Sequence, residues 1–315
     1  MMKNTSRKGV IVGTGFVGTG IAYSILNQNI LDEMVLVDLN EDKAAGEARD
    51  LFDGVTYTQS NCRVKSGNYS ECKDADVVVI TAGINQKPGQ TRLELVDTNA
   101  KIMKSIVKEI MASGFDGILV VASNPVDVLT YIAWQESGLP QNRVVGTGTS
   151  LDSTRLRMQI ANKLNVDPHD VSAYIIGEHG DSETAVWSHA TVGGKPIMDM
   201  IADGEGITKE DLDEMYVAVR DAAYYIIDRK GYTNFGIGLS TARVVKAILN
   251  DERAILPVSA YFEGQYGLED IYTGIPAIVT ENGVERIVEL HITEDEKAQL
   301  HKSAAELKEV LDSVR

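Results

Sequence analysis

A histidine and an aspartate provide the first chemistry that this sequence suggests. His179 stands in the segment Glu178-His179-Gly180-Asp181, and Asp152 precedes it by 27 residues. A histidine can carry a proton near neutral pH, and a carboxylate on one ring nitrogen can fix its tautomer. The other four histidines, at positions 169, 189, 291 and 301, stand in polar or surface-like settings without a matching partner. We therefore predict that His179 donates and accepts a proton and that Asp152 orients it.

Arg155 lies three residues after Asp152 on a predicted helix, so the two side chains share a face. They could form a surface ion pair that contributes about 0.2–0.5 kcal/mol. Alternatively, Asp152 faces His179, and Arg155 binds a substrate carboxylate with its planar, two-pronged set of donors. The sequence leaves both interpretations open.

A second arginine follows the polar segment 85–92, which leaves a predicted strand and enters a long helix. Such a loop can close over a substrate and carry Arg92 into a site without water, where its charge stabilises a developing oxyanion. An exposed arginine at a helix start is the alternative, although a cation there opposes the helix dipole. We favour a lid that carries a catalytic Arg92.

Three glycines near the start of the chain predict a dinucleotide site. Gly13, Gly15 and Gly18 follow the apolar run 9–12 and open a helical stretch, and Asp38 ends the next apolar run. Glycines at this spacing let the backbone approach a pyrophosphate, which the helix N-terminus also attracts. A carboxylate about 20 residues further on can accept hydrogen bonds from ribose hydroxyls and would repel a 2′-phosphate. We therefore predict NAD as the cofactor, bound in part by the N–H groups of Phe16 and Val17.

Apolar runs and helical stretches alternate through the first half of the chain. Strands are predicted at 10–12, 34–38, 77–81 and 118–123, with helices at 17–27, from 42 onward and at 93–113. This alternation is typical of a doubly wound parallel sheet of the Rossmann type. Helices are also predicted at 150–163, 212–230, 238–250 and 293–314, with a segment at 171–176. We predict an α/β protein with an NAD-binding Rossmann domain at 1–148 and an α+β substrate-binding, catalytic domain at 149–315.

Composition narrows the class of protein. Thirty Lys and Arg residues against 46 Asp and Glu give a net charge of −16, which disfavours nucleic acids and anionic membranes as partners. Cys62 and Cys72 lack the spacing of a metal or redox motif, so we expect reduced structural thiols, no metal site and a cytoplasmic location. No apolar run approaches the ~20 residues of a membrane span. We expect neither export nor anchoring.

Several motifs occur in an order that is typical of one family. They are the segments 13–18, 85–92, 123–127, 151–155 and 176–181. With them, the chain resembles the bacterial type of L-lactate dehydrogenase, in the lactate/malate dehydrogenase family, over essentially its whole length. The resemblance implies reversible transfer of a hydride between NADH and C2 of pyruvate, while His179 transfers a proton to or from the substrate oxygen.

The same resemblance implies a role for each matching residue. Arg92 would polarise the carbonyl, Arg155 would hold the carboxylate, and Asn124 would bind the reacting oxygen. Gln86, Asp127, Asp152 and Thr233 would complete the substrate site. The implied cofactor contacts are Gly13, Gly15, Phe16, Val17, Gly18, Asp38, Lys43, Tyr69, Gly83, Ile84, Ser105, Ala122, Ser123, Asn124 and Thr147, the last a departure from the usual serine.

Substrate choice rests on Gln86, because malate dehydrogenases typically carry an arginine there for the second carboxylate of oxaloacetate. A neutral side chain favours pyruvate, although Lys87 beside it keeps a malate dehydrogenase-like activity open. Many bacterial relatives respond to fructose 1,6-bisphosphate through an arginine and a histidine; Arg157 matches the first, but Ser172 replaces the second. The resemblance also implies a homotetramer. The alternative from another class is a catalytically silent NAD-binding module.

Overall fold

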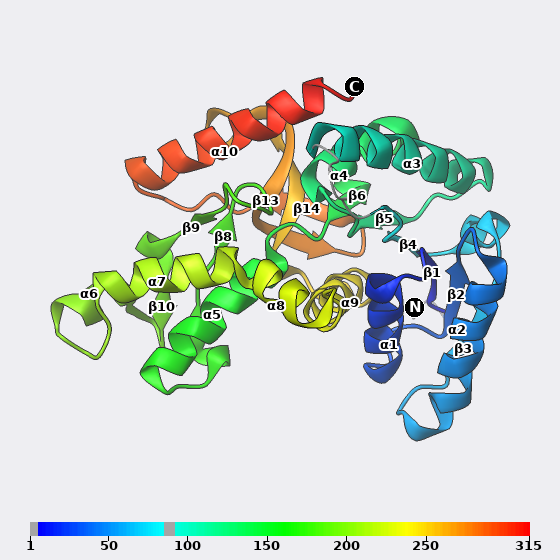
Figure 1. Cartoon of the computed structure of the whole chain (residues 1–315), viewed down its shortest axis with the longest axis horizontal. Coiled ribbons are helices and arrows are strands. Elements are labelled where there is room, and N and C mark those ends of the chain that lie inside the picture. The colour runs from blue at the N-terminus through cyan, green and yellow to red at the C-terminus, as the bar shows by residue number, and fades with distance from the viewer. Residues whose placement is uncertain (1–5, 85–91) are drawn as a thin grey trace.

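The computed structural model describes residues 6–84 and 92–315, with side chains from residue 94 onward in the second range. Within these residues, nine strands form one sheet in the order β14-β13-β12-β6-β5-β4-β1-β2-β3 (Figure 1). Six of the strands are parallel: β1 (Lys8–Val12), β2 (Glu33–Val37), β3 (Arg63–Ser66), β4 (Val77–Ile80), β5 (Ile118–Val121) and β6 (Val144–Gly146). Their order is that of a Rossmann sheet, which confirms the predicted fold class.

Helices connect these parallel strands. They are α1 (Phe16–Asn27), α2 (Glu41–Gly54), α3 (Arg92–Ala112) and α4 (Val126–Ser137). Every residue of β4 and β5 is buried, as continuously apolar strands covered on both faces must be. The boundaries of the elements predicted in this half are within two residues of those observed, but β3, β6 and α4 were not predicted. The first eight residues of α4 are all buried, so its sequence lacks the polar face of an amphipathic helix.

The second half of the chain adds helices and short antiparallel pairs. It comprises α5 (Ser150–Leu164), β7 (Val171–Ser172), β8 (Ile175–Ile176), β9 (Thr184–Ala185), β10 (Thr191–Val192), β11 (Lys195–Pro196), α6 (Ile197–Ala202), α7 (Lys209–Arg220), α8 (Ala222–Lys230) and α9 (Phe235–Leu249). The predicted single helix at 212–230 is therefore wrong in two respects, because α7 begins already at Lys209 and because Asp221 separates α7 from α8.

Three long antiparallel strands extend the sheet beyond β6. They are β12 (Ala254–Glu263), β13 (Glu269–Thr280) and β14 (Gly283–Ile287), and the chain ends in α10 (Glu294–Asp312). Ser259 of β12 pairs with Gly146 of β6. In Figure 1, α9 lies beside α1, and the Phe16 ring stacks on Tyr232 with 3.7 Å between ring centroids. The shared sheet and the contact between α1 and α9 therefore both join the two halves.

The helix predicted at 293–314 is confirmed, and it carries one apolar stripe. α10 begins with a capping box between Thr293 and Glu296, and its stripe is buried against the main core: Leu300, Ala304, Leu307, Leu311 and Val314. Helix α10, drawn in red, crosses one side of the molecule in Figure 1. In the described part of the chain, we find no helix with the length and apolar character required to cross a bilayer.

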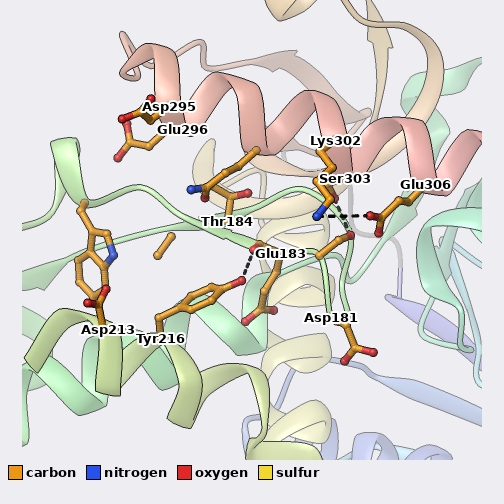
Figure 2. A pocket seen from close by; sticks show the side chains of 14 residues that line it. Asp181, Glu183, Thr184, Asp213, Tyr216, Asp295, Glu296, Lys302, Ser303 and Glu306 are labelled. Carbon is orange, nitrogen blue, oxygen red and sulfur yellow. Dashed lines mark hydrogen bonds and ion pairs between the residues drawn. The ribbon is translucent and has the colours of Figure 1, made fainter. Parts of the chain in front are cut away.

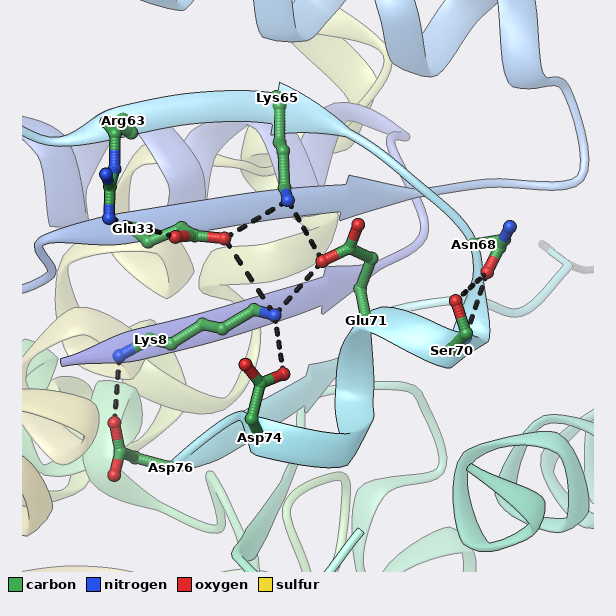
Figure 3. A network of polar contacts seen from close by, with 9 residues as sticks. All are labelled: Lys8, Glu33, Arg63, Lys65, Asn68, Ser70, Glu71, Asp74 and Asp76. Atoms are coloured by element: carbon green, nitrogen blue, oxygen red, sulfur yellow. Dashed lines mark hydrogen bonds and ion pairs between the residues drawn. The ribbon is translucent and has the colours of Figure 1, made fainter. Parts of the chain in front are cut away.

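A buried lysine fixes the first strand. Figure 3 shows the Lys8 ammonium group among the carboxylates of Glu33, Glu71 and Asp74, at 3.8, 3.0 and 2.7 Å. Burial opposes its charge, but the carboxylates of Asp74 and Glu71 hold the pKa of Lys8 above its usual value. The Lys8 N–H also donates to Asp76. This network ties β1 to the segment that precedes β4, at the end of β1 opposite the glycine turn.

The two cysteines are free thiols, as predicted. Both side chains are buried, and burial raises the pKa of each thiol to about 12. Neutral thiols of this kind pack as small apolar groups, and they are poor nucleophiles because the thiolate is the reactive form.

Candidate active site

The structure brings His179 and Asp152 together. Asp152 lies in the first turn of α5, His179 follows β8, and Nδ1 of the ring is 2.6 Å from Oδ2 of the carboxylate. Asp152 is only 2% exposed, so little water screens the pair. The Asp152 carboxylate is the main reason that the pKa of His179 rises to about 9. At neutral pH the ring therefore carries a proton that it can donate.

Four hydrogen bonds fix the main chain from Gly177 to His179. Gly177 and Gly274 exchange two backbone hydrogen bonds of 2.9 Å. The Glu178 N–H donates to Ser303 Oγ, and the His179 N–H donates to Asp127 Oδ2, at 2.8 and 2.9 Å. Gly177 has a φ of +89°, where a side chain would be strained and would meet Ser303. The loop that carries the histidine is thus held rigidly at its base.

The buried side chain of Asp127 hydrogen-bonds the loop that carries His179. It is 2% exposed, and its second oxygen accepts a 2.6 Å hydrogen bond from Ser259 Oγ. Burial raises the pKa of Asp127 to about 7 despite these two hydrogen bonds. Its implied contact with substrate stays a prediction, and its observed contacts are with His179 and Ser259.

Asp152 contacts both Arg155 and His179, which the sequence left as alternatives. Arg155 Nη1 donates to Asp152 Oδ1 at 2.9 Å, while the other oxygen of Asp152 faces His179. The pair is not a surface ion pair, because the side chains are 16% and 2% exposed. The guanidinium group has five N–H donors, so it can pair with Asp152 and still offer donors to a carboxylate.

Contrary to the prediction, His169 has a carboxylate partner. Its Nδ1 atom lies 2.6 Å from Asp167 Oδ1, the same distance as in the buried pair. Its side chain is 93% exposed, however, so the solvent screens this contact. Burial, and not the histidine–carboxylate distance, distinguishes His179.

The glycine turn has the shape required for a pyrophosphate. A Cβ atom on Gly18 would lie 1.9 Å from the Gly13 carbonyl oxygen, so only glycine allows this close approach of α1 to β1. Among the described residues, α1 has neither a side-chain cap at Gly15 nor an acidic residue in its first turn. Its N-terminal N–H groups are thus directed to an anion, and the turn fits the pyrophosphate of NAD.

Asp38 follows β2 and faces the glycine turn. Its Oδ2 atom accepts from both N–H and Oγ1 of Thr14, at 2.6 and 2.9 Å, and its Oδ1 atom accepts from the Asn40 N–H. Burial opposes the charge, but these hydrogen bonds hold the pKa of Asp38 below its usual range. Asp38 is therefore an anion in the position expected for a ribose-binding carboxylate.

Most of the other predicted cofactor residues lie just beyond the carboxyl ends of parallel strands, which share one edge of the sheet. Tyr69 follows β3; Gly83 and Ile84 follow β4; Ala122, Ser123 and Asn124 follow β5; Thr147 follows β6. Lys43 and Ser105 lie instead on α2 and α3, with exposed side chains. The prediction that Gln86 contacts substrate lies outside the described residues, as does Lys87, and Arg92 is described only as the first residue of α3.

Sequence reasoning missed Asn99, a buried amide on α3. Its Oδ1 atom accepts from the Ile84 N–H at 2.9 Å, and its Nδ2 atom donates to the carbonyl oxygens of Ile84 and Asn124. Asn99 thus links the segments that follow β4 and β5. Asn99 stands beside Asp97, Thr98 and Lys101 in the sequence, so no local signal indicated that its amide would be buried.

The remaining predicted residues lie on other segments than His179. Thr233 is half-buried in the connection between α8 and α9. Arg157 of α5 donates from Nε to the Ala173 carbonyl oxygen at 3.1 Å, and Ser172 of β7 is exposed. The two residues of the predicted effector site, Arg157 and Ser172, therefore lie on α5 and β7.

Comparison with known proteins matches nearly the whole chain to one family. A model described as the lactate/malate dehydrogenase NAD binding domain matches residues 7–146, and one for the alpha/beta C-terminal domain of that family matches 149–315. The chain is 62% identical over 314 residues to "L-lactate dehydrogenase 2" of Lactococcus lactis subsp. lactis (strain IL1403), covering 100% of both. It is 58% identical to "L-lactate dehydrogenase 2" of Enterococcus faecalis (strain ATCC 700802 / V583), covering 100% of this chain and 99% of that one.

A solved structure extends this similarity to three dimensions. The minor L-lactate dehydrogenase from Enterococcus mundtii, in its ligands-bound form, matches with a TM-score of 0.97 and 63% identity. The match covers 98% of this chain and 99% of that one.

Proposed function

Since this chain belongs to the lactate/malate dehydrogenase family and has NAD-dependent L-lactate dehydrogenase activity, we propose that His179, Asp152, Arg155 and Arg92 perform its reaction. The observation that carries the assignment is the buried contact of 2.6 Å between His179 and Asp152. NAD supplies the hydride chemistry when it is bound. The residues of the chain then have to bind, orient and protonate the substrate.

His179 delivers a proton from Nε2 to the pyruvate oxygen, because Nδ1 is directed at Asp152. Asp152 keeps the ring in this tautomer and stabilises its charged form. Arg155 binds the substrate carboxylate beside the ring, and Asn124 bonds the reacting oxygen. Arg92 polarises the carbonyl from the start of α3. In lactate oxidation the neutral ring of His179 accepts the proton instead.

We propose that the cofactor lies along the carboxyl edge of the parallel strands. The turn of Gly13, Gly15 and Gly18 binds the pyrophosphate, Asp38 binds the ribose, and the residues after β4, β5 and β6 contact the nicotinamide half. On this arrangement, residues 1–148 form the NAD-binding domain and residues 149–315 the substrate-binding, catalytic domain.

Consumption of NADH with pyruvate and, separately, with oxaloacetate tests the proposal. We expect a clear preference for pyruvate, because Gln86 offers no charge to a second carboxylate. Gln86→Arg is expected to move the preference toward oxaloacetate, and Lys87→Gln is expected to leave it unchanged. A wild-type preference for oxaloacetate would transfer the specificity role to Lys87. Bound NADH without turnover would support a silent module instead.

We propose that fructose 1,6-bisphosphate does not activate this protein. A bisphosphate needs several cations. Arg157 is held at the Ala173 carbonyl and over the Tyr174 ring, and Ser172 adds no charge. We expect the same kcat/KM for pyruvate with and without the bisphosphate. Ser172→His is the informative variant, since a gain of activation in it would show that one missing cation accounts for the difference.

We also propose a cytoplasmic homotetramer. Large apolar side chains are exposed on or beside α1, α8 and α9, and such surfaces typically pack against another subunit: Phe16, Tyr224, Tyr225, Ile227, Phe235 and Leu239. Light scattering on the eluted protein measures the mass directly. A mass of four chains is expected, against 34.3 kDa for one chain.

A further inference from the structure

A third ionisable group lies against the catalytic pair. Glu183 precedes β9, it is 4% exposed, and one of its carboxylate oxygens lies within 4.8 Å of ligand atoms of both Asp152 and His179. Among the described residues, its Oε1 atom is buried without a hydrogen-bond partner. A buried carboxyl oxygen without a partner is costly, and a buried titratable group beside a charged pair is a candidate for a functional role.

The charges around Glu183 come from three segments. Helix α5 contributes Asp152 and Arg155, the loop after β8 contributes His179, and α7 contributes Arg220 and Tyr216, whose hydroxyl donates to the Glu183 carbonyl oxygen. The main chain of His179 also contacts Asp127. The acidic groups that act on the ring are thus Asp152, Asp127 and Glu183, and Arg155 is the cation beside Asp152. Each of these acids, when ionised, favours the charged form of His179.

Glu183 and His179 therefore influence the proton affinity of each other. Burial, followed by the nearby Asp152 carboxylate, raises the pKa of Glu183 to about 8, while the charged ring and Arg155 favour its anion. The Glu183 carboxylate in turn favours the imidazolium. An opposite charge at ~4–6 Å typically shifts a pKa by about 1–3 units. Two groups coupled this strongly titrate as a pair.

Glu183 also lines a pocket of about 730 Å³ between α7 and α10. Figure 2 shows its side chain near Tyr216 of α7, with Lys302 and Ser303 of α10 across the pocket. Asp213 of α7 lines the same pocket, but its side chain is exposed. Asp213 thus provides an acidic control on the same pocket whose charge is exposed to solvent.

The same three side chains could be considered as ligands for a metal ion. Both oxygens of Asp152, however, already accept hydrogen bonds, one from Arg155 at 2.9 Å and one from His179 at 2.6 Å. A divalent ion there would lie against the guanidinium cation and repel it. A proton satisfies the same oxygens without this cost.

We propose that Glu183 is a positioning residue, whose buried carboxylate beside Asp152 strengthens the binding of the transferable proton to His179. The inference rests on the proposed role of His179 in proton transfer. With Glu183 present, the ring stays charged to a higher pH than Asp152 alone would allow. Pyruvate reduction, which needs the charged ring, thereby extends further into the alkaline range.

The first test measures the ring itself. The protein is labelled with [13Cε1]histidine, the signal of His179 is assigned by its absence from His179→Gln, and its pKa is followed in the wild type, Glu183→Gln, Glu183→Asp and Asp213→Asn. We expect Glu183→Gln to lower the pKa of His179 by roughly one unit or more. Glu183→Asp is expected to restore part of the shift, and Asp213→Asn to give the wild-type value. An unchanged pKa in Glu183→Gln overturns the inference, whatever the kinetics show.

The second test measures kcat/KM for pyruvate against pH in the same proteins, because this ratio reports ionisation of the free enzyme. The alkaline limb of Glu183→Gln is expected to move to lower pH by the same amount as the pKa of the ring. If kcat/KM falls equally at every pH, while the alkaline limb and the pKa of His179 stay unchanged, Glu183 has a structural role only. If the pKa of His179 falls but the alkaline limb of kcat/KM stays in place, the role of Glu183 is supported and the proposed proton transfer by His179 is contradicted.

Discussion

Asp127 holds the main chain of His179, with its Oδ2 atom 2.9 Å from the histidine N–H. Two buried aspartates thus position one histidine: Asp152 aligns the ring, and Asp127 fixes the backbone that carries it. Asp127 lies at the start of α4 in the first half of the chain, and Asp152 lies in α5 in the second. The geometry of the histidine therefore depends on both halves.

Loss of the Ser259 hydroxyl is expected to weaken this arrangement. Ser259→Ala removes the 2.6 Å hydrogen bond to Asp127 Oδ1 and leaves a buried carboxyl oxygen unpaired, at a cost of about 1–3 kcal/mol. Urea unfolding at fixed protein concentration measures the change, and kcat is expected to fall with it. Ser113→Ala is the control, because its hydroxyl donates to the Ile110 carbonyl at the end of α3 and, among the described residues, holds no buried charge. Equal stability of the two variants would contradict the role given to Asp127.

Removal of the proton carrier is expected to stop the reaction without affecting cofactor binding. General acid–base catalysis contributes about 10²- to 10⁴-fold, so His179→Gln is expected to lower kcat by that range. NADH affinity, measured by fluorescence titration, is expected to stay within about twofold, since no bond to the cofactor is lost in this variant. His169→Gln also loses a histidine with a carboxylate at 2.6 Å, but at an exposed site. A similar loss in both would refute the assignment.

Opposite pH dependences are expected for the two directions. The pKa of His179 is raised to about 9, so the charged ring dominates below this pH and the neutral ring above it. Pyruvate reduction is expected to be constant from pH 6 to 8 and to fall about tenfold per pH unit above 9. Lactate oxidation is expected to rise with pH toward 9. Initial rates in both directions check this, and limbs near pH 6.5, the unperturbed value for histidine, would rule out the strong influence of Asp152.

Asp38 is expected to set the choice of cofactor. Its negative charge would lie close to a 2′-phosphate and repel it. In Asp38→Ala, the ratio of kcat/KM for NADPH to that for NADH is expected to rise at least about tenfold, or about 1.4 kcal/mol. The ratio is the appropriate measurement, because loss of the acceptor for the Thr14 N–H lowers both rates. Asp42→Ala removes an exposed charge from the first turn of α2 and is expected to leave the ratio unchanged.

The parallel part of the fold was predictable because local patterns determine it. The fully buried strands β4 and β5 are continuous apolar runs, and the glycines of the first turn have a spacing that few other structures require. The strands β12 and β13 were not predicted. Pro257 and Pro276 face each other in this pair, and proline argues against a strand when only the sequence is read.

The contacts of the site were also predictable only in part. The contact between His179 and Asp152 was predicted because both residues belong to recognisable segments. The roles of Asn99, Asp127 and Glu183 depend on contacts between segments far apart in the chain, and no local pattern reports such contacts. The ion pair of Arg155 with Asp152 lies between these cases, since spacing suggested it but burial decides its strength.

The continuous sheet limits the large movements available to the molecule. In an enzyme with two lobes joined by a flexible connection, the lobes can rotate as rigid bodies about a hinge. Here β12 pairs with β6, and the ring of Phe16 lies on Tyr232, so rotation of one half against the other would break strand pairing and aromatic stacking together. Changes on ligand binding are therefore confined to single segments, and the radius of gyration measured by small-angle scattering is expected to be the same with and without NADH.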